Sequence, residues 1–77
     1  MRYIVKYRMY NGAPVEEMQI DAMNVDDAHS KATYDVLGTG EYYPYSVWVA
    51  GRIDDKGIVH WFDVQEGEWC QAVTRYI

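Results

Sequence analysis

Residues 24–38 constrain the fold most, because they form the only segment with a convincing helical pattern. Asn24 is a suitable N-cap, and Asp27 completes an imperfect capping box. Apolar residues recur at spacings of three and four, and Leu37 widens their stripe: Val25, Ala28, Ala32 and Val36. Gly38 is expected to end the helix in the left-handed conformation. Since the stripe consists mainly of small residues, its expected partner is a flat sheet.

The remaining chain has the alternation and turn residues of β-strands. Five strands are predicted, in two groups on either side of the helix: Arg2–Tyr10, Val15–Ala22, Tyr45–Ile53, Ile58–Val64 and Trp69–Ile77. The last three are expected to form an antiparallel meander. The sequence therefore predicts a single α+β domain over residues 1–77, one helix packed on an antiparallel sheet, in the order β-β-α-β-β-β.

A specific register is predicted for the first hairpin. If a four-residue loop separates Tyr10 and Val15, the apolar residues of both strands share one face: Tyr7 opposite Met18, Val5 opposite Ile20 and Tyr3 opposite Ala22. Arg8 then lies opposite Glu17 and Lys6 opposite Gln19, on the other face. A slip by one residue would mix the two faces, so the pattern opposes it.

The predicted meander has two different faces. The mostly aliphatic face is expected to hold the helix: Val47, Val49, Gly51, Ile53, Ile58, Phe62, Val64 and Val73. The opposite face carries Trp48, Trp61 and Tyr76, which a single helix on the first face cannot cover. Three interpretations remain open for this aromatic face: a hot-spot patch for a partner, a homodimer seam, or a core layer closed by the N-terminal hairpin.

Composition and charge exclude several classes of function. The net charge of -5 argues against a general affinity for nucleic-acid backbones and suits a basic partner surface. A single cysteine, Cys70, permits no internal disulfide, which favours an intracellular protein. No signal peptide or membrane span is expected, because charges interrupt the apolar residues near the N-terminus. The expected location is the cytoplasm.

No catalytic or metal-binding motif is present. His29, His60 and Cys70 are the only residues suited to nucleophilic or zinc chemistry, and they lie far apart in the sequence without paired spacing. His29 is expected to be solvated on the helix flank, and His60 to lie towards the rim of the aliphatic face. The prediction is therefore that the protein is not an enzyme and that it needs no cofactor and no metal.

A partner-binding site is predicted from aromatic and acidic residues in the second half of the chain. Tyrosines flank Pro44, and tyrosine is enriched at interfaces, although these rings could equally plug the end of the helix–sheet sandwich. The acidic pair after the third strand is expected to steer a basic partner, since direct DNA mimicry would need acids spaced along one surface. The predicted partner-binding residues are Tyr43, Tyr45, Trp48, Arg52, Asp54, Asp55 and Trp61.

The layout of the first half of the chain carries a resemblance to a known group of proteins. The run from Met18 to Ala22, the cap at Asn24, the Ala-rich helix and its end at Leu37 and Gly38 resemble small phage and mobile-element proteins, several anti-CRISPR proteins among them. The resemblance implies a non-enzymatic inhibitor that docks on a CRISPR effector complex in the host bacterial cytoplasm. It would block DNA binding or nuclease recruitment. The resemblance carries no site residue over.

Two other classes of function remain open. One is a housekeeping protein-interaction domain or homodimer. The other is a single-stranded nucleic-acid binder that uses the aromatic sheet face as a stacking platform, against which the acidic balance argues.

Overall fold

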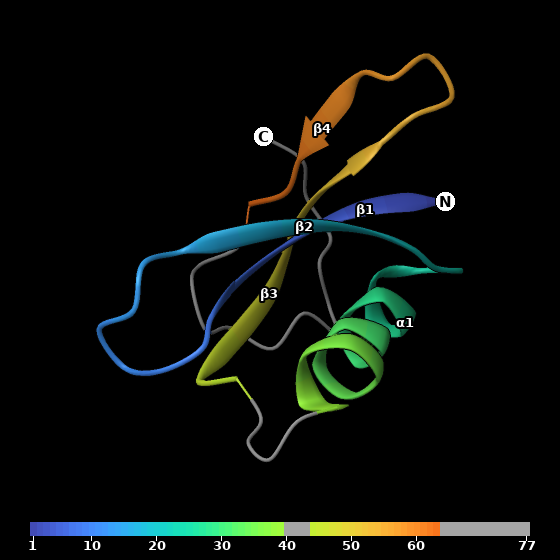
Figure 1. The fold of residues 1–77 in the computed structure, drawn as a ribbon. Helices are drawn as coiled ribbons and strands as arrows, with labels where there is room; N and C mark the ends of the chain where they lie inside the picture. Colours follow the sequence, from blue (N-terminus) through green and yellow to red (C-terminus); the bar gives the residue numbers. More distant parts are fainter. Residues whose placement is uncertain (40–43, 64–77) are drawn as a thin grey trace.

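The computed structural model describes residues 1–39 and 44–63 and shows a four-stranded antiparallel sheet with one helix packed against it (Figure 1). The strands are β1 (Arg2–Arg8), β2 (Glu16–Asp21), β3 (Ser46–Ile53) and β4 (Val59–Trp61), in the spatial order β2-β1-β3-β4. The α+β class and the order β-β-α-β-β are as predicted. The predicted fifth strand, residues 69–77, lies outside the described residues.

The helix changes its winding along its length. It begins as α1 (Val25–Ser30), continues as a π-helical turn, η1 (Lys31–Val36), and ends as a short 3-10 turn, η2 (Leu37–Thr39). The predicted N-terminal cap is confirmed, because the Asn24 side chain accepts a 2.8 Å hydrogen bond from the Asp27 backbone. Asp27 reaches back in turn and accepts from the Met23 N–H at 2.9 Å, one residue before the cap.

The π-helical turn changes which residues reach the core. The Leu37 N–H donates to the Ala32 carbonyl five residues back, so the position after Ala32 that faces the sheet is Leu37 rather than Val36. Leu37 packs against the core, whereas Val36 is 47% exposed. The prediction that Val36 belongs to the buried stripe is therefore wrong. The prediction that Gly38 adopts the left-handed conformation is also wrong, because the only described residues with a positive φ are Gly12 and Gly57.

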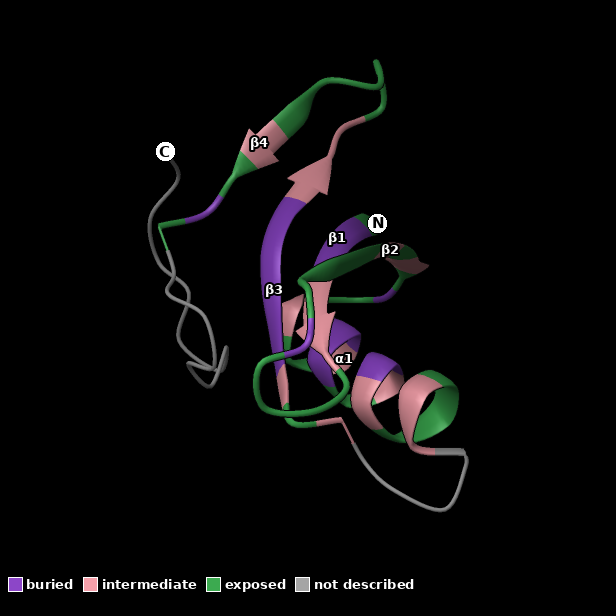
Figure 2. Ribbon diagram, turned by 60° about the vertical axis from the view of Figure 1, so that its left-hand side comes forward, coloured by how far each residue is buried: buried purple, intermediate pink, exposed green. Residues whose placement is uncertain are grey.

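Ile4 and Trp48 are buried on the face of the sheet away from the helix, but the main core lies between the helix and the other face. Ala28 and Ala32 are fully buried there, and their small side chains let the helix approach the central strands. The remaining buried cluster comes mainly from β1 and β3: Tyr3, Val5, Ala22, Val47, Trp48, Val49, Ala50 and Phe62. Figure 2 shows this buried colour concentrated on β3 and β1 and on the side of the helix that faces them.

The helix also buries a histidine. His29 is only 4% exposed, and its Nε2 donates a 3.1 Å hydrogen bond to the Val47 carbonyl in β3. The expectation that His29 is solvated is therefore wrong. Burial lowers the pKa of His29, because desolvation penalises the charged imidazolium more than the Val47 carbonyl and the nearby Asp26 favour it.

The first hairpin is shifted by two residues from the predicted register. Tyr3 lies opposite Ile20, Val5 opposite Met18 and Lys6 opposite Glu17. A shift of two leaves every side chain on its predicted face, so the faces are as predicted while the individual pairs are wrong. The turn is correspondingly tighter than the predicted four-residue loop: the Ala13 N–H donates to the Tyr10 carbonyl, and Gly12 takes a φ of 88° between them.

The N-terminal hairpin is not a separate layer over the meander, because β1 pairs directly with β3 in the same sheet. The register shifts between Ile4 and Val5: Val5 lies opposite Val49, but Ile4 lies opposite Gly51, so one extra residue of β3 forms a bulge. Beyond the bulge the alternation of β3 is inverted. The predicted placement of Gly51 on the same face as Val49 is therefore wrong.

No helix among the described residues is long and apolar enough to cross a membrane.

Candidate partner-binding surface

The β3–β4 hairpin extends from one end of the sheet, away from the helix (Figure 1). Its turn is organised by Asp54, whose Oδ1 accepts 2.9 Å hydrogen bonds from the backbones of Lys56 and Ile58. The Asp54 N–H and carbonyl bond to Ile58 and Gly57, both at 3.0 Å. Gly57 has a φ of 83°, which a glycine adopts without strain. Residues 54–57, which separate the predicted strands Tyr45–Ile53 and Ile58–Val64, therefore form a turn that is held by its own first residue.

A second contact of Asp54 ties the turn to β4. The Oδ2 of Asp54 lies 2.8 Å from the Nε2 of His60, and both side chains are only partly exposed. This contact and the backbone donors lower the pKa of Asp54, because they favour the charged carboxylate. Both carboxylate oxygens are thus used inside the hairpin. Asp54 therefore stabilises the turn, whereas Asp55 is the exposed residue of the predicted acidic pair.

Trp61 is the most prominent aromatic group on the hairpin. The side chain remains 39% exposed, although neighbours hold its ring in place. The Nζ of Lys6, on β1, lies 5.1 Å from the ring centroid, which is a cation–π distance. On β3, a Cβ added to Gly51 would lie only 3.2 Å from the Trp61 ring. Gly51 thus leaves the space into which the indole packs, and the ring is accessible but ordered by its surroundings.

The predicted partner-binding residues do not include Val59, although it lies beside Trp61 on the same face of β4. Val59 is exposed and pairs with Ile53, two positions from the pair of Trp61 with Gly51, so the apolar surface continues from the tryptophan along the strand. Alternation along the predicted strand Ile58–Val64 already puts Val59 and Trp61 on one face, so the signal was present in the sequence. Ile58, at the turn, is 55% exposed, but the same alternation directs it to the opposite side of the hairpin.

The structure separates the seven predicted partner-binding residues. Arg52, Asp54, Asp55 and Trp61 all lie on the β3–β4 hairpin. Arg52 pairs with His60 and therefore points to the face opposite Trp61, so its predicted place beside the tryptophan is wrong. Trp48 is 6% exposed and belongs to the buried cluster, so its ring is not accessible. Tyr45 is exposed but precedes the start of β3, at the opposite end of that strand from the hairpin turn. Tyr43 and Tyr76 lie outside the described residues.

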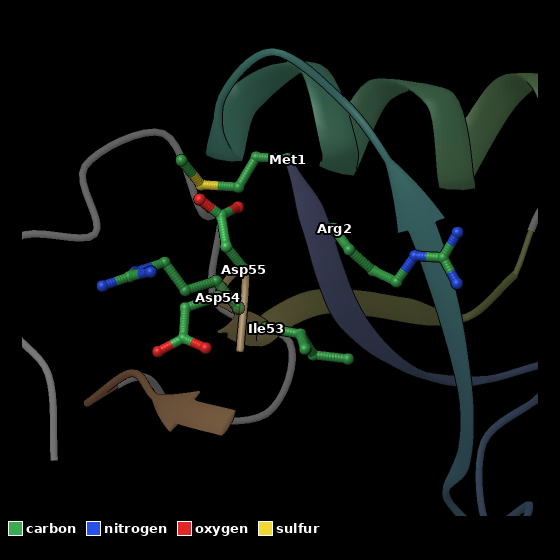
Figure 3. Close-up of a pocket in the computed structure, with 6 residues that line it drawn as sticks. Met1, Arg2, Ile53, Asp54 and Asp55 are labelled. Carbon is green, nitrogen blue, oxygen red and sulfur yellow. The ribbon is translucent and has the colours of Figure 1, made fainter. Parts of the chain in front are cut away.

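A shallow hollow of about 570 Å³ lies beside the hairpin, lined by Met1, Arg2, Arg52, Ile53, Asp54 and Asp55. Figure 3 shows that Arg2 extends away from it over β2, and that Asp54 and Asp55 point to different sides. Arg2 makes a two-pronged contact with the Asp21 carboxylate at 3.1 and 3.2 Å. The guanidinium lowers the pKa of Asp21, first through these hydrogen bonds and then through its charge. Most charged groups around the hollow are thus already engaged.

Within residues 1–39 and 44–63 no cluster of three or more His, Cys, Asp or Glu side chains is arranged to hold a metal ion. His29 lies under the helix and His60 on the hairpin, so the structure does not bring the two described histidines into one site. Cys70 is outside the described residues. Comparison of the chain with family models, curated proteins and solved structures finds no match.

Proposed function

We propose that this protein is a non-enzymatic protein-binding domain that docks through the exposed side of the β3–β4 hairpin. The observation that carries the proposal is Trp61, whose ring is accessible but held between Lys6 and the backbone at Gly51. A ring that is ordered before binding loses little conformational entropy in the complex. Tryptophan is also among the residues most enriched at interface hot spots.

The hairpin supports this role through its rigidity and its apolar rim. The Asp54 side chain accepts three hydrogen bonds, from the Lys56 and Ile58 backbones and from His60, so the hairpin has a defined position. Val59, which shares the Trp61 face of β4, extends the apolar surface beside the tryptophan. The chain's net charge of -5 favours a partner with a basic surface, which the field of the domain would attract.

The proposed partner is a CRISPR effector complex, and docking would block DNA binding or nuclease recruitment. Support for this finer step comes from the resemblance of residues 18–38 to small anti-CRISPR proteins. The partner is tested separately from the surface. Failure to bind a purified effector complex would contradict the proposed partner only. The proposed docking surface on the hairpin would then be tested with proteins captured from a bacterial lysate.

The experiment compares two aromatic truncations on different hairpins. Trp61→Ala should weaken partner binding by at least about 2 kcal/mol if the ring is a hot spot. Tyr10→Ala removes an exposed ring from the other hairpin and should leave binding unchanged. Melting curves of both variants exclude unfolding as the cause. Val59→Asp, which places a charge on the exposed surface beside Trp61, provides a second test that does not alter the packing around Gly51.

Two outcomes would contradict the proposal. Equal losses in Trp61→Ala and Tyr10→Ala would remove the hairpin as the docking surface. Binding of single-stranded oligonucleotides at physiological salt, with affinity falling steeply as salt rises and no protein captured, would replace it with a nucleic-acid-binding function.

A further inference from the structure

The outer edge of β2 offers backbone groups for pairing. Ala22 donates to the Met1 carbonyl at 2.9 Å, and the Met1 nitrogen donates to the Ala22 carbonyl at 3.0 Å. In an antiparallel ladder, pairs that exchange two such bonds alternate with pairs that exchange none. Continued along the register, the alternation directs three residues' backbone groups away from β1: Glu17, Gln19 and Asp21. Among the described strands, none lies beyond this edge.

One end of this edge is covered by a side chain. Lys31, on the helix, places its Nζ 3.5 Å from the Asp21 carbonyl. Glu17 and Gln19 remain as the open stretch, with an N–H and a carbonyl each. Edge strands are usually protected by charged side chains, above all lysine, by proline or by a bulge; β2, Glu-Glu-Met-Gln-Ile-Asp, carries acids but neither lysine nor proline.

The open stretch also carries uncompensated negative charge. Glu17 lies opposite Lys6 in the register. The Lys6 ammonium, however, lies over the ring of Trp61, which belongs to β4, the strand at the far end of the order from β2. No ion pair to Glu17 forms within residues 1–39 and 44–63. Arg2, by contrast, engages Asp21. The exposed Glu16 adds to the acidity, so the edge would repel a second copy of itself and attract a basic strand.

The face of β2 that carries Met18 and Ile20 favours apolar neighbours. Met18 and Ile20 are half-buried and pack against the core on the side of the helix. Residues directly opposite each other in neighbouring strands share a face, so an added strand would place side chains beside both. We propose that β2 accepts a strand from a partner protein, with basic residues opposite Glu17 and aliphatic residues opposite Met18 and Ile20.

A synthetic seven-residue peptide of alternating Lys and Val, with both ends capped, is the probe for this proposal. It should bind the full chain at low salt, and amide NMR should show the largest shifts and new exchange protection at Glu17 and Gln19. Met18 and Ile20 should change less, because their amides already bond to β1. A peptide with Glu in place of Lys should not bind.

N-methylated peptides test the hydrogen bonds without altering the protein. In an antiparallel added strand with Lys opposite the outward-facing Glu17, the Lys amides point at β2 and the Val amides point away. N-methylation of the Lys amides should therefore abolish binding, whereas N-methylation of the Val amides should be tolerated. Equal binding by both methylated peptides would overturn strand addition.

A matched pair of charge reversals tests the position of the acid. Glu17→Lys and Asp35→Lys change the net charge equally, but Asp35 lies exposed on the helix. Glu17→Lys should weaken peptide binding at least about fivefold and Asp35→Lys less than about twofold, since directly opposed charges dominate. Equal losses, no binding of the Lys–Val peptide at millimolar concentration, or a dimer of the chain that protects Glu17 and Gln19 would each overturn the proposal.

Discussion

At the scale of single residues, His29 links stability to pH. Its pKa is lowered by burial, so the unfolded chain binds a proton more readily than the folded one. Stability due to this residue is therefore complete above the unfolded value of about 6.5 and falls as the pH drops below it, by up to about 1.4 kcal/mol per pH unit. His29→Gln should flatten the dependence of the unfolding free energy between pH 7.5 and 5.5, measured by urea denaturation. An unchanged slope would mean that the imidazole is not buried in neutral form.

Gly51 gives a second prediction at this scale. A Cβ at this position would lie 2.8 Å from the His60 carbonyl oxygen, which is backbone and cannot rotate away. Gly51→Ala should therefore destabilise the domain by about 1–3 kcal/mol, as measured by thermal unfolding. The double variant Gly51→Ala with Trp61→Ala is the control. Rescue by removal of the ring would show that the clash is with the indole and not with the strand.

At the scale of elements, the π-helical turn makes neighbouring positions differ. Leu37→Asp should unfold the domain or lower its melting temperature sharply, because an unpaired carboxylate would enter the core. Val36→Asp should be tolerated, since that side chain is half-exposed. A regular α-helix from Ala32 would reverse the two results. The melting temperatures of the two variants therefore decide which winding the protein adopts.

Sequence patterns predicted the kind of each element better than its register. Asn24 and the turn at Asp54 were predictable because local chemistry fixes them. The two-residue shift of the first hairpin was not predictable, because a shift of two keeps every side chain on its face. Hydrophobic alternation therefore cannot distinguish the two registers. The loop decides it instead: Ala13 is buried, and the Arg8 side chain donates to its carbonyl.

The candidate site was predictable only in part, for a similar reason. Alternation predicted that Trp48 and Trp61 lie on one face of the sheet. The structure agrees, because Lys6 lies opposite Trp48 in the register and its ammonium lies over the Trp61 ring. Which of the two rings is exposed depends on long-range packing, which no local pattern reports. The bulge in β3 shifts the alternation after Val49, and its cause is tertiary pairing rather than a visible sequence signal.

At the scale of the whole molecule, the two proposed surfaces lie on the two outer strands of the sheet that residues 1–39 and 44–63 form. β4 presents an ordered tryptophan, and β2 presents backbone groups with acidic side chains. Lys6 connects them, because its position over Trp61 leaves Glu17 without its cross-strand cation. Trp61→Ala should free Lys6 to meet Glu17 and should thereby weaken binding of the Lys–Val peptide. Unchanged peptide affinity in Trp61→Ala would show that the two edges act independently.

Site-specific photo-crosslinking tests docking through the hairpin most directly. A photoreactive phenylalanine analogue is placed at Trp61 in one variant and at Tyr10 in another, and both are illuminated in living bacterial cells and with a purified CRISPR effector complex. The hairpin proposal predicts one discrete crosslinked protein from position 61, lost when Val59→Asp is added, and none from position 10. Crosslinks from position 10 alone, or from both positions equally, would contradict it.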